Sequence, residues 1–166
     1  ACVFTAPGIP MIFQGQEFME DKWFQDTDPL DWQRAEQLGG IVQLYSDLIQ
    51  LRLNRNGTSR GLTGQHIDTF HLDHDNKLLA YHRWQDGGPG DSVVVVLNFA
   101  NRTLQDYAVA FPAAGEWQLR FDSHYAGYDE SFEGQVSGAV TAVSTQNGSK
   151  VAKINIAPYS AIIYSQ

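Results

Sequence analysis

The chain has 166 residues, close to one domain in size; with 43% apolar and 18% charged residues it can build a core, which excludes a disordered protein. Its formal charge of −8 argues against a nucleic-acid partner, because a phosphate backbone needs a basic surface. No apolar run approaches the roughly 18 residues of a membrane span, and a single cysteine, Cys2, cannot form an internal disulfide. We therefore expect a globular protein with neither nucleic acid nor membrane among its partners.

The first recognisable element is an apolar run at residues 8–13, followed by Gly15. A run without alternation predicts a strand buried on both faces, as in a parallel sheet, with Pro10 at its start because proline cannot donate to a ladder. Residues 14–33 show no periodicity and mix acids with tryptophans. Carboxylates bind hydroxyls and indoles cover the apolar face of a sugar ring, so this loop is a candidate sugar-binding segment. The alternative is an acidic, solvated loop whose tryptophans only pack.

A helix is predicted over residues 34–55, where apolar side chains recur at steps of three and four. Gly39 and Gly40 weaken its first turns by about 1 kcal/mol each, and Asn56-Gly57 can end it in the left-handed conformation. Beyond the helix the hydrophobic period changes, so a boundary between two regions is placed near Gly61.

The rest of the chain has the period of two that is typical of strands, with turn residues at intervals of roughly ten. Seven or eight strands are predicted, at residues 67–72, 77–84, 92–99, 105–110, 116–121, 136–143, 150–156 and 160–165. The expected fold is an antiparallel β-sandwich with Greek-key connections. Residues 93–97 lack alternation and should form a central strand that is covered on both faces.

The segment Gly8-Ile9-Pro10-Met11-Ile12-Phe13-Gln14-Gly15-Gln16-Glu17-Phe18 resembles the eighth barrel strand of the α-amylase family, glycoside hydrolase family 13. Further stretches resemble the same enzymes: Pro29-Leu30-Asp31-Trp32, Leu97-Asn98-Phe99, Gly115-Glu116-Trp117, residues 121–128 and residues 157–164. The β region is most similar to the C-terminal domain of 1,4-α-glucan branching enzymes. Gln16, where those enzymes usually carry asparagine, and Tyr125-Ala126-Gly127, where they carry tyrosine-glycine-glycine, keep a hydrolytic α-amylase open.

The resemblance implies that residues 1–60 are the last strand, loop and helix of a truncated (β/α)8 barrel, and that residues 61–166 are the all-β domain. The family's three catalytic carboxylates lie at barrel strands four, five and seven, which this chain does not include. The chain is therefore expected to be a fragment that stabilises a missing catalytic barrel, is inactive alone, and binds neither cofactor nor metal. Its parent would act on α-glucan, in the cytoplasm of a bacterium.

Two groups of side chains are candidates for sugar contact. The resemblance implies a rim of the substrate cleft, with Glu17 in a supporting position, formed by Gln14, Gln16, Glu17, Trp23 and Trp32. Aromatic residues of the β region could form a surface platform, unless they are core anchors: Trp117, Tyr125, Tyr128 and Phe132. The stretch His71-Leu72-Asp73-His74-Asp75 is not predicted to bind metal, because its two histidines point to opposite faces of a strand.

Two other functions stay open at this point. The β region could be an autonomous glucan-binding module, or a protein-interaction domain that uses exposed strand edges and the apolar helix stripe. Residues 9–13 are relevant to the protein-interaction alternative. A barrel strand pairs with a neighbouring strand on each edge, and the chain does not include those neighbours, so an apolar edge would be left open for association. We expect this segment to fold back onto the chain's own helix or sheet, to self-associate with a second copy, or to be disordered.

Overall fold

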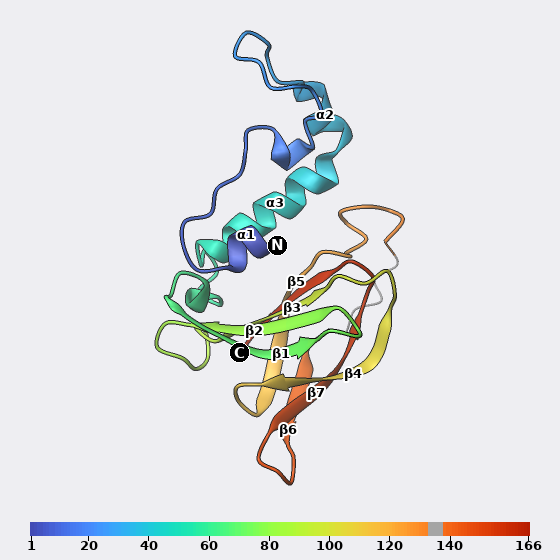
Figure 1. Cartoon of the computed structure of the whole chain (residues 1–166). Helices are drawn as coiled ribbons and strands as arrows, with labels where there is room; N and C mark the ends of the chain where they lie inside the picture. The colour runs from blue at the N-terminus through green and yellow to red at the C-terminus, as the bar shows by residue number, and fades with distance from the viewer. Residues whose placement is uncertain (133–137) are drawn as a thin grey trace.

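The computed structural model describes residues 1–132 and 138–166, and it places a layer of short helices over a curled β-sheet (Figure 1). In this part of the chain, eight antiparallel strands follow the order β1-β2-β3-β8-β5-β6-β7-β4. The strands are β1 (His66–Asp73), β2 (Leu78–Trp84), β3 (Val93–Asn98), β4 (Leu104–Phe111), β5 (Gly115–Asp122), β6 (Val140–Ser144), β7 (Lys150–Ile156) and β8 (Ala161–Ser165). The predicted all-β region is confirmed. The expected strand at 136–143 begins at Val140, and residues 136 and 137 lie outside the described residues.

Strand β3 is the centre of the fold, and all of its residues are buried. Val94 and Val96 point into a core that lies within the curl of the sheet, together with side chains of β4 to β8. Val93, Val95 and Leu97 point into a second core, on the opposite face, beneath the helices. The prediction of a strand covered on both faces is therefore confirmed.

Within the described residues, five helices precede the strands: α1 (Cys2–Thr5), η1 (Gln16–Phe18), α2 (Trp32–Gln37), α3 (Gly39–Arg52) and η2 (Arg60–Leu62). The single helix predicted over residues 34–55 is in fact two, because Leu38 has a non-helical backbone (φ −108°, ψ 36°). Asn54 takes the left-handed conformation soon after α3 (φ 51°), and Gly57 of the predicted Asn56-Gly57 pair is also left-handed (φ 70°). The side-chain Oδ1 of Asn54 accepts a hydrogen bond from the backbone N–H of Ser59 at 2.8 Å, which fixes the end of the helix.

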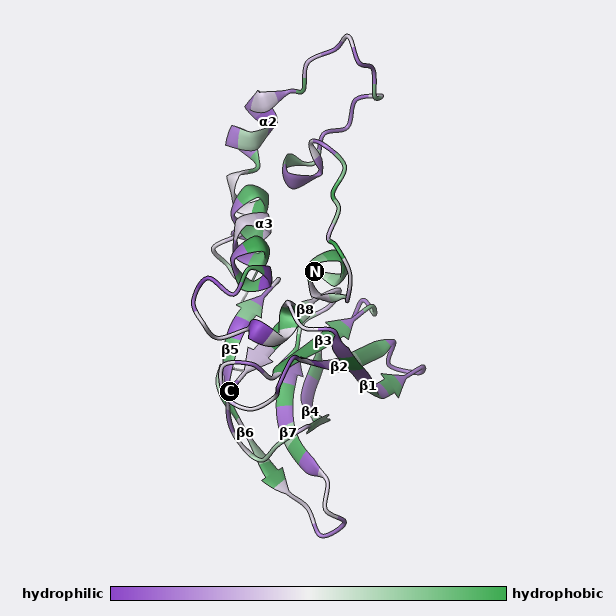
Figure 2. Cartoon of the chain, turned by 90° about the vertical axis from the view of Figure 1, so that its left-hand side faces the viewer, coloured by the Kyte–Doolittle hydropathy of each residue, from purple (hydrophilic) through white to green (hydrophobic). Residues whose placement is uncertain are grey.

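The strand predicted at residues 8–13 is wrong for this chain, because the segment pairs with none of the strands in the described part of the chain. Ile12 packs against the second core. Ile9, Met11 and Phe13 are 97%, 83% and 57% exposed, and Figure 2 shows this apolar trace leaving α1 towards η1. The alternation is that of a strand with one covered face, so the segment has folded back at Ile12 while its other face stays open.

Two arginines attach the first eight residues to the rest of the molecule. Arg83 of β2 is fully buried, and its guanidinium donates to the carbonyl oxygen of Thr5. Arg52, at the end of α3, donates to the carbonyl oxygens of Phe4, Ala6 and Gly8. These contacts hold the short α1 between the helix and the sheet.

The turn between β2 and β3 is organised by Asp91, which is 4% exposed. Its carboxylate accepts hydrogen bonds from the backbone N–H groups of Gln85, Asp86 and Gly87. Burial disfavours the charged carboxylate, but these bonds and nearby Arg60 outweigh burial and leave the pKa of Asp91 below its ordinary value.

We expect Asp91→Asn to lower the free energy of unfolding at pH 7 by about 2 kcal/mol, because hydrogen bonds to a charged acceptor are lost. A depressed folded-state pKa stabilises the fold above the unfolded pKa of about 4, and this stabilisation is lost as the pH falls through the folded value. Urea unfolding of both proteins from pH 7 to pH 2 should show the difference shrinking towards zero. A difference that does not change with pH would contradict this role of the carboxylate.

Candidate functional site

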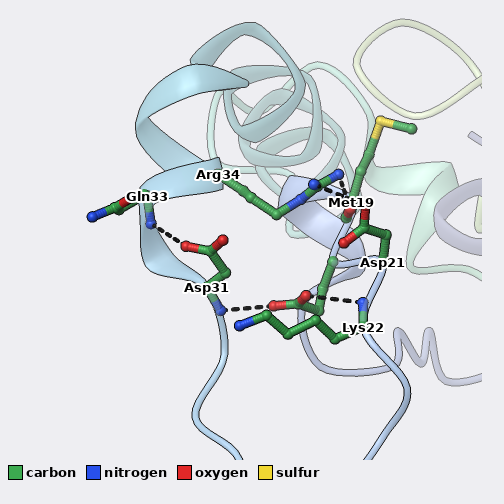
Figure 3. A network of polar contacts seen from close by, with 7 residues as sticks. Met19, Asp21, Lys22, Asp31, Gln33 and Arg34 are labelled. Atoms are coloured by element: carbon green, nitrogen blue, oxygen red, sulfur yellow. Dashed lines mark hydrogen bonds and ion pairs between the residues drawn. The ribbon is translucent and has the colours of Figure 1, made fainter.

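The loop between η1 and α2 has a stem that the carboxylate of Glu20 holds together. Its Oε2 accepts a hydrogen bond from the backbone N–H of Asp31 at 2.7 Å, and its Oε1 accepts one from that of Lys22 at 3.1 Å (Figure 3). The bonds from Asp31 and then Lys22 lower the pKa of Glu20. Gly15 makes room for this side chain, since a Cβ there would lie 2.5 Å from the Cβ of Glu20.

Arg34 of α2 makes the second connection across the stem. Its Nη1 donates to Oδ2 of Asp21 at 3.0 Å and its Nη2 to the carbonyl oxygen of Met19 at 2.7 Å, as Figure 3 shows. Asp31 caps α2 by accepting from the backbone N–H of Gln33 at 3.1 Å. The two sides of the stem are thus joined by side chains from both ends of the loop.

The loop tip and the segment before η1 enclose a pocket of about 320 Å³, which is at the lower end of the usual range for ligand pockets. Its aromatic lining consists of Phe13, Trp23 and Phe24, and the rings of Phe13 and Phe24 meet edge to face at 5.2 Å. Pro29 and Leu30 add apolar surface. The polar lining residues are Gln14, Gln16, Glu20, Lys22, Gln25 and Asp28.

Of the five rim residues implied by the sequence, Gln14, Gln16 and Trp23 line this pocket. Trp32 does not line it, and its ring packs on that of Phe18 at 5.2 Å. Glu17 does not line it either, and its Oε2 is buried without a hydrogen-bond partner among the described residues. The structure thus brings three of the five together.

Sequence reasoning missed most of the remaining lining. Phe13 belongs to a run that predicts a strand buried on both faces, and Lys22, Gln25 and Asp28 lie in a stretch without periodicity. The wider mixture of acids, amides and tryptophans was the available signal. Which of them share one pocket depends on the stem contacts, which leave no pattern in the sequence.

The four aromatic residues proposed as a surface platform do not share one exposed face. Trp117 is fully buried in the core of the curled sheet, and its Nε1 donates to the carbonyl oxygen of Ala113 at 3.1 Å. Tyr125 is exposed and meets Tyr128 edge to face at 5.4 Å, whereas Phe132 stacks on His124 at 4.4 Å. The prediction that Trp117 belongs to a surface platform is therefore wrong, because its indole fills the core.

The hydroxyl of Tyr128 is also engaged, since it donates to Oδ2 of Asp47 in α3 at 2.5 Å. Burial is the main cause that raises the pKa of Tyr128, and the bond to Asp47 adds to it. Tyr128 therefore joins the loop after β5 to the helical layer, and of the four platform candidates Tyr125 remains the exposed ring.

In residues 1–132 and 138–166, no three side chains of His, Cys, Asp or Glu gather closely enough to hold a metal ion. His71 lies 2.9 Å from the hydroxyl of Tyr107, which itself donates to Asp73 at 2.6 Å. Among the described helices, none has the length and apolar character needed to cross a bilayer.

The pocket is suited to binding rather than to bond cleavage. Hydrolysis of a glycosidic bond requires a carboxylic acid with a raised pKa and a second carboxylate on the other side of the bond. The pocket carboxylates are Glu20 and Asp28. Glu20 already accepts two backbone hydrogen bonds, and its pKa is lowered, so it is a poor proton donor.

The relatives similar to this chain are 1,4-α-glucan branching enzymes by name, and the similar solved structures include a pullulanase and an α-amylase. A 1,4-α-glucan branching enzyme of Rhizobium meliloti is 29% identical over 96% of this chain, and one of Burkholderia thailandensis is 28% identical over 98%. The chain spans about a fifth of the length of these relatives (22% and 20%). The all-β fold is shared with a pullulanase from Anoxybacillus sp. LM18-11 (TM-score 0.63, 18% identity, 99% of this chain and 22% of that chain) and an α-amylase from H. orenii (TM-score 0.59, 19% identity, 98% and 33%).

The family assignment rests on the β region. The family described as alpha amylase, C-terminal all-beta domain, matches residues 70–166, more than half of the chain. This range includes β2 to β8 and the second half of β1. The chain therefore belongs to the family of alpha amylase C-terminal all-beta domains.

Proposed function

We propose that this chain is the C-terminal part of an α-glucan-acting enzyme. In this proposal, residues 61–166 are the all-β domain and residues 1–60 are the final strand, loop and helix of the catalytic barrel. Relatives that are branching enzymes by name, and that are much longer than this chain, support it. A bacterial, cytoplasmic parent is part of the same proposal.

The observation that carries the proposal is the open face of residues 9–13. Ile9 and Met11 are almost fully exposed although they alternate in the manner of a strand. Unpaired strand edges with apolar side chains are association sites. The remaining strands of a barrel would supply both the backbone partners and the apolar cover, so the barrel is the proposed partner. Self-association through the same residues stays a prediction.

The all-β domain would stabilise that barrel through the helical layer. Tyr81 and Arg83 of β2 contact α1 at Thr5, and Tyr128 contacts α3 at Asp47. Both helices precede the boundary that the sequence places near Gly61. These contacts support a structural role of the domain. The alternative of an autonomous sugar-binding module is weakened by the burial of Trp117.

We expect the 166-residue chain to show neither branching nor hydrolytic activity on amylose, because its pocket lacks a pair of carboxyl groups suited to glycoside cleavage. Iodine staining of amylose, together with reducing-end release, would measure the two activities. A full-length branching enzyme assayed in parallel shows that the conditions are adequate. Activity of the purified chain above a heat-treated sample would refute the proposed function.

A further inference from the structure

We propose that a pocket at the end of β5 binds a small quaternary ammonium ion, of which choline is an example. The pocket has a volume of about 270 Å³, less than the roughly 300–1,000 Å³ that is usual for drug-sized ligands. Its lining residues are Leu119, Arg120, Phe121, Asp122, Tyr125 and Tyr128. None of them lines the pocket between η1 and α2, and the proposal does not depend on the activity of the parent enzyme.

Two successive turns bring one acidic and two aromatic side chains together. The backbone N–H of Tyr125 donates to the carbonyl oxygen of Asp122 at 3.2 Å, and that of Tyr128 donates to the carbonyl oxygen of Tyr125 at 2.9 Å. Oδ1 of Asp122 also accepts the backbone N–H of His124 at 2.8 Å, which fixes the first turn. The repeated spacing of three residues therefore places the three side chains around one pocket.

The rings of Tyr125 and Tyr128 form a corner. Their planes meet at 87°, with the ring centroids 5.4 Å apart. The backbone at Gly127 packs so closely on the ring of Tyr125 that an added Cβ would clash with it, and the hydroxyl of Tyr128 is bonded to Asp47 at 2.5 Å. Both rings are thus held in place before a ligand binds. The face of an aromatic ring attracts a cation, because its π-electrons carry partial negative charge.

Asp122 adds a negative charge that has no counter-ion in the described part of the chain, where neither of the two ion pairs includes it. Burial raises the pKa of Asp122, because it disfavours the charged carboxylate, and the bond from His124 only partly offsets this effect. Burial and Asp47 are the main causes of the raised pKa of Tyr128, and the charge of Asp122 adds to them. The carboxylate therefore lies near this ring, and a cation bound in the corner would pair with it.

A quaternary ammonium ion suits this lining better than a primary one. A primary ammonium group brings three N–H donors that need acceptors, whereas the carboxylate of the lining is that of Asp122, and one of its oxygens already accepts from His124. A quaternary group has no N–H donors, so aromatic faces and one negative charge are sufficient for it.

Arg120 opposes the binding of a cation, because it is the positively charged residue of the lining. Its Nε donates to Oγ of Ser165 at 2.8 Å, which holds the side chain in position. We therefore expect weak binding, with a dissociation constant on the order of 1 mM. Removing the like charge should strengthen binding, so Arg120→Gln is expected to bind choline about threefold more tightly.

Titration of the 166-residue chain with choline, followed by the NMR shifts of the backbone amides of Tyr125 and Tyr128, tests the proposal. We expect saturable shifts, and we expect the neutral isostere 3,3-dimethylbutan-1-ol to bind about tenfold more weakly, because it has the same shape without the charge. Phosphocholine should also bind more weakly than choline, since its phosphate brings a negative charge towards Asp122. Tighter binding of phosphocholine would refute a free ammonium ion as the ligand and favour a lipid headgroup.

Two variants separate the contributions of the ring and of the carboxylate. Tyr125→Leu keeps an apolar side chain without the aromatic face and should weaken choline binding about fivefold. Asp122→Asn keeps the oxygen that accepts from His124, so the turn is retained while binding weakens by about the same factor. Tyr159→Leu is the matched control, because Tyr159 is 68% exposed, comparable to the 58% of Tyr125, but does not line the pocket. Its affinity should equal that of the wild type.

Three results would overturn the site. The first is the absence of saturable shifts up to about 20 mM choline, well above the expected constant. The second is equal binding of choline and its neutral isostere, which would show an apolar pocket without selectivity for charge. The third is an unchanged affinity in Tyr125→Leu. All three would leave the proposed function intact, since that depends on the inactivity of the chain towards amylose.

Discussion

Replacing Arg83 with methionine should lower the free energy of unfolding by about 3 to 4 kcal/mol, the largest effect expected for a side chain outside the two apolar cores. The guanidinium of Arg83 is fully buried and faces four carbonyl oxygens. Its Nε donates to His66 at 3.0 Å, and its Nη2 donates to Gly64 at 2.6 Å and to Leu62 at 3.3 Å. The fourth bond, from Nη1, reaches Thr5 in α1.

Methionine has a similar length but no donor, so buried carbonyl groups would lose their partner and water cannot reach them easily. An unsatisfied buried acceptor costs about 1–3 kcal/mol. Lysine keeps the charge but lacks the planar fork, so Arg83→Lys should recover only part of the loss. Urea unfolding measures the free energies, and hydrogen exchange at Thr5 and Ala6 reports whether α1 is released.

Arg52→Met is the matched control, because Arg52 binds neighbouring carbonyl groups of the same segment from a half-buried position at the end of α3. Water can replace its partly exposed donors, so a loss of about 1 kcal/mol is expected. Equal losses for the two variants would contradict the special role that burial gives to Arg83.

Adding a methyl group at two neighbouring glycines of α3 should have opposite effects on stability. A Cβ at position 40 would lie 1.8 Å from the carbonyl oxygen of Tyr128, whereas a Cβ at position 39 meets nothing within 4 Å. The Tyr128 segment cannot move away freely, because its backbone N–H donates to Tyr125 at 2.9 Å and its hydroxyl is bonded to Asp47. The close approach explains a glycine that helix propensity alone would disfavour.

We expect Gly40→Ala to cost about 2 to 3 kcal/mol through overpacking, and Gly39→Ala to stabilise the protein by up to about 1 kcal/mol through helix propensity. Thermal and urea unfolding of the two variants, each compared with the wild type, measure whether the free energy of unfolding falls for Gly40→Ala and rises for Gly39→Ala. Similar changes for both would show that propensity, and not contact with Tyr128, determines the effect at position 40.

The strands could be predicted from the sequence because their signals are local. The uniformly apolar run at 93–97 forms the strand that both cores share. The turn at residues 86–90 lies where Asp86 and the glycines that follow it predict a turn. Residues 9–13 carry an equally clear strand signal, yet a strand needs a partner, and none of the described strands pairs with them. Local pattern shows what a segment can become, while pairing depends on the rest of the molecule.

The site was less predictable, because exposure within a strand depends on register. Strand β5 has an irregularity between Leu119 and Phe121 in its pairing with β8. As a result Trp117 and Phe121, four residues apart, lie in different cores, although regular alternation would place them on one face. No feature of the sequence near Trp117 separates a core indole from one on a sugar platform. In the loop, the family resemblance implied Gln14, Gln16 and Trp23, which line the pocket, but also Glu17 and Trp32, which do not, because the stem contacts determine which side chains share it.

The burial of β3 on both faces also determines how the protein should unfold. Its valines pack alternately against the helical layer and against the curled half of the sheet. Loss of either layer would uncover one face of the same strand, and so would weaken the packing of the other layer. The change of hydrophobic period near Gly61 marks a boundary in the sequence, but the free energy of folding is shared across it. Helices and sheet should therefore melt in a single cooperative transition, as one thermodynamic unit.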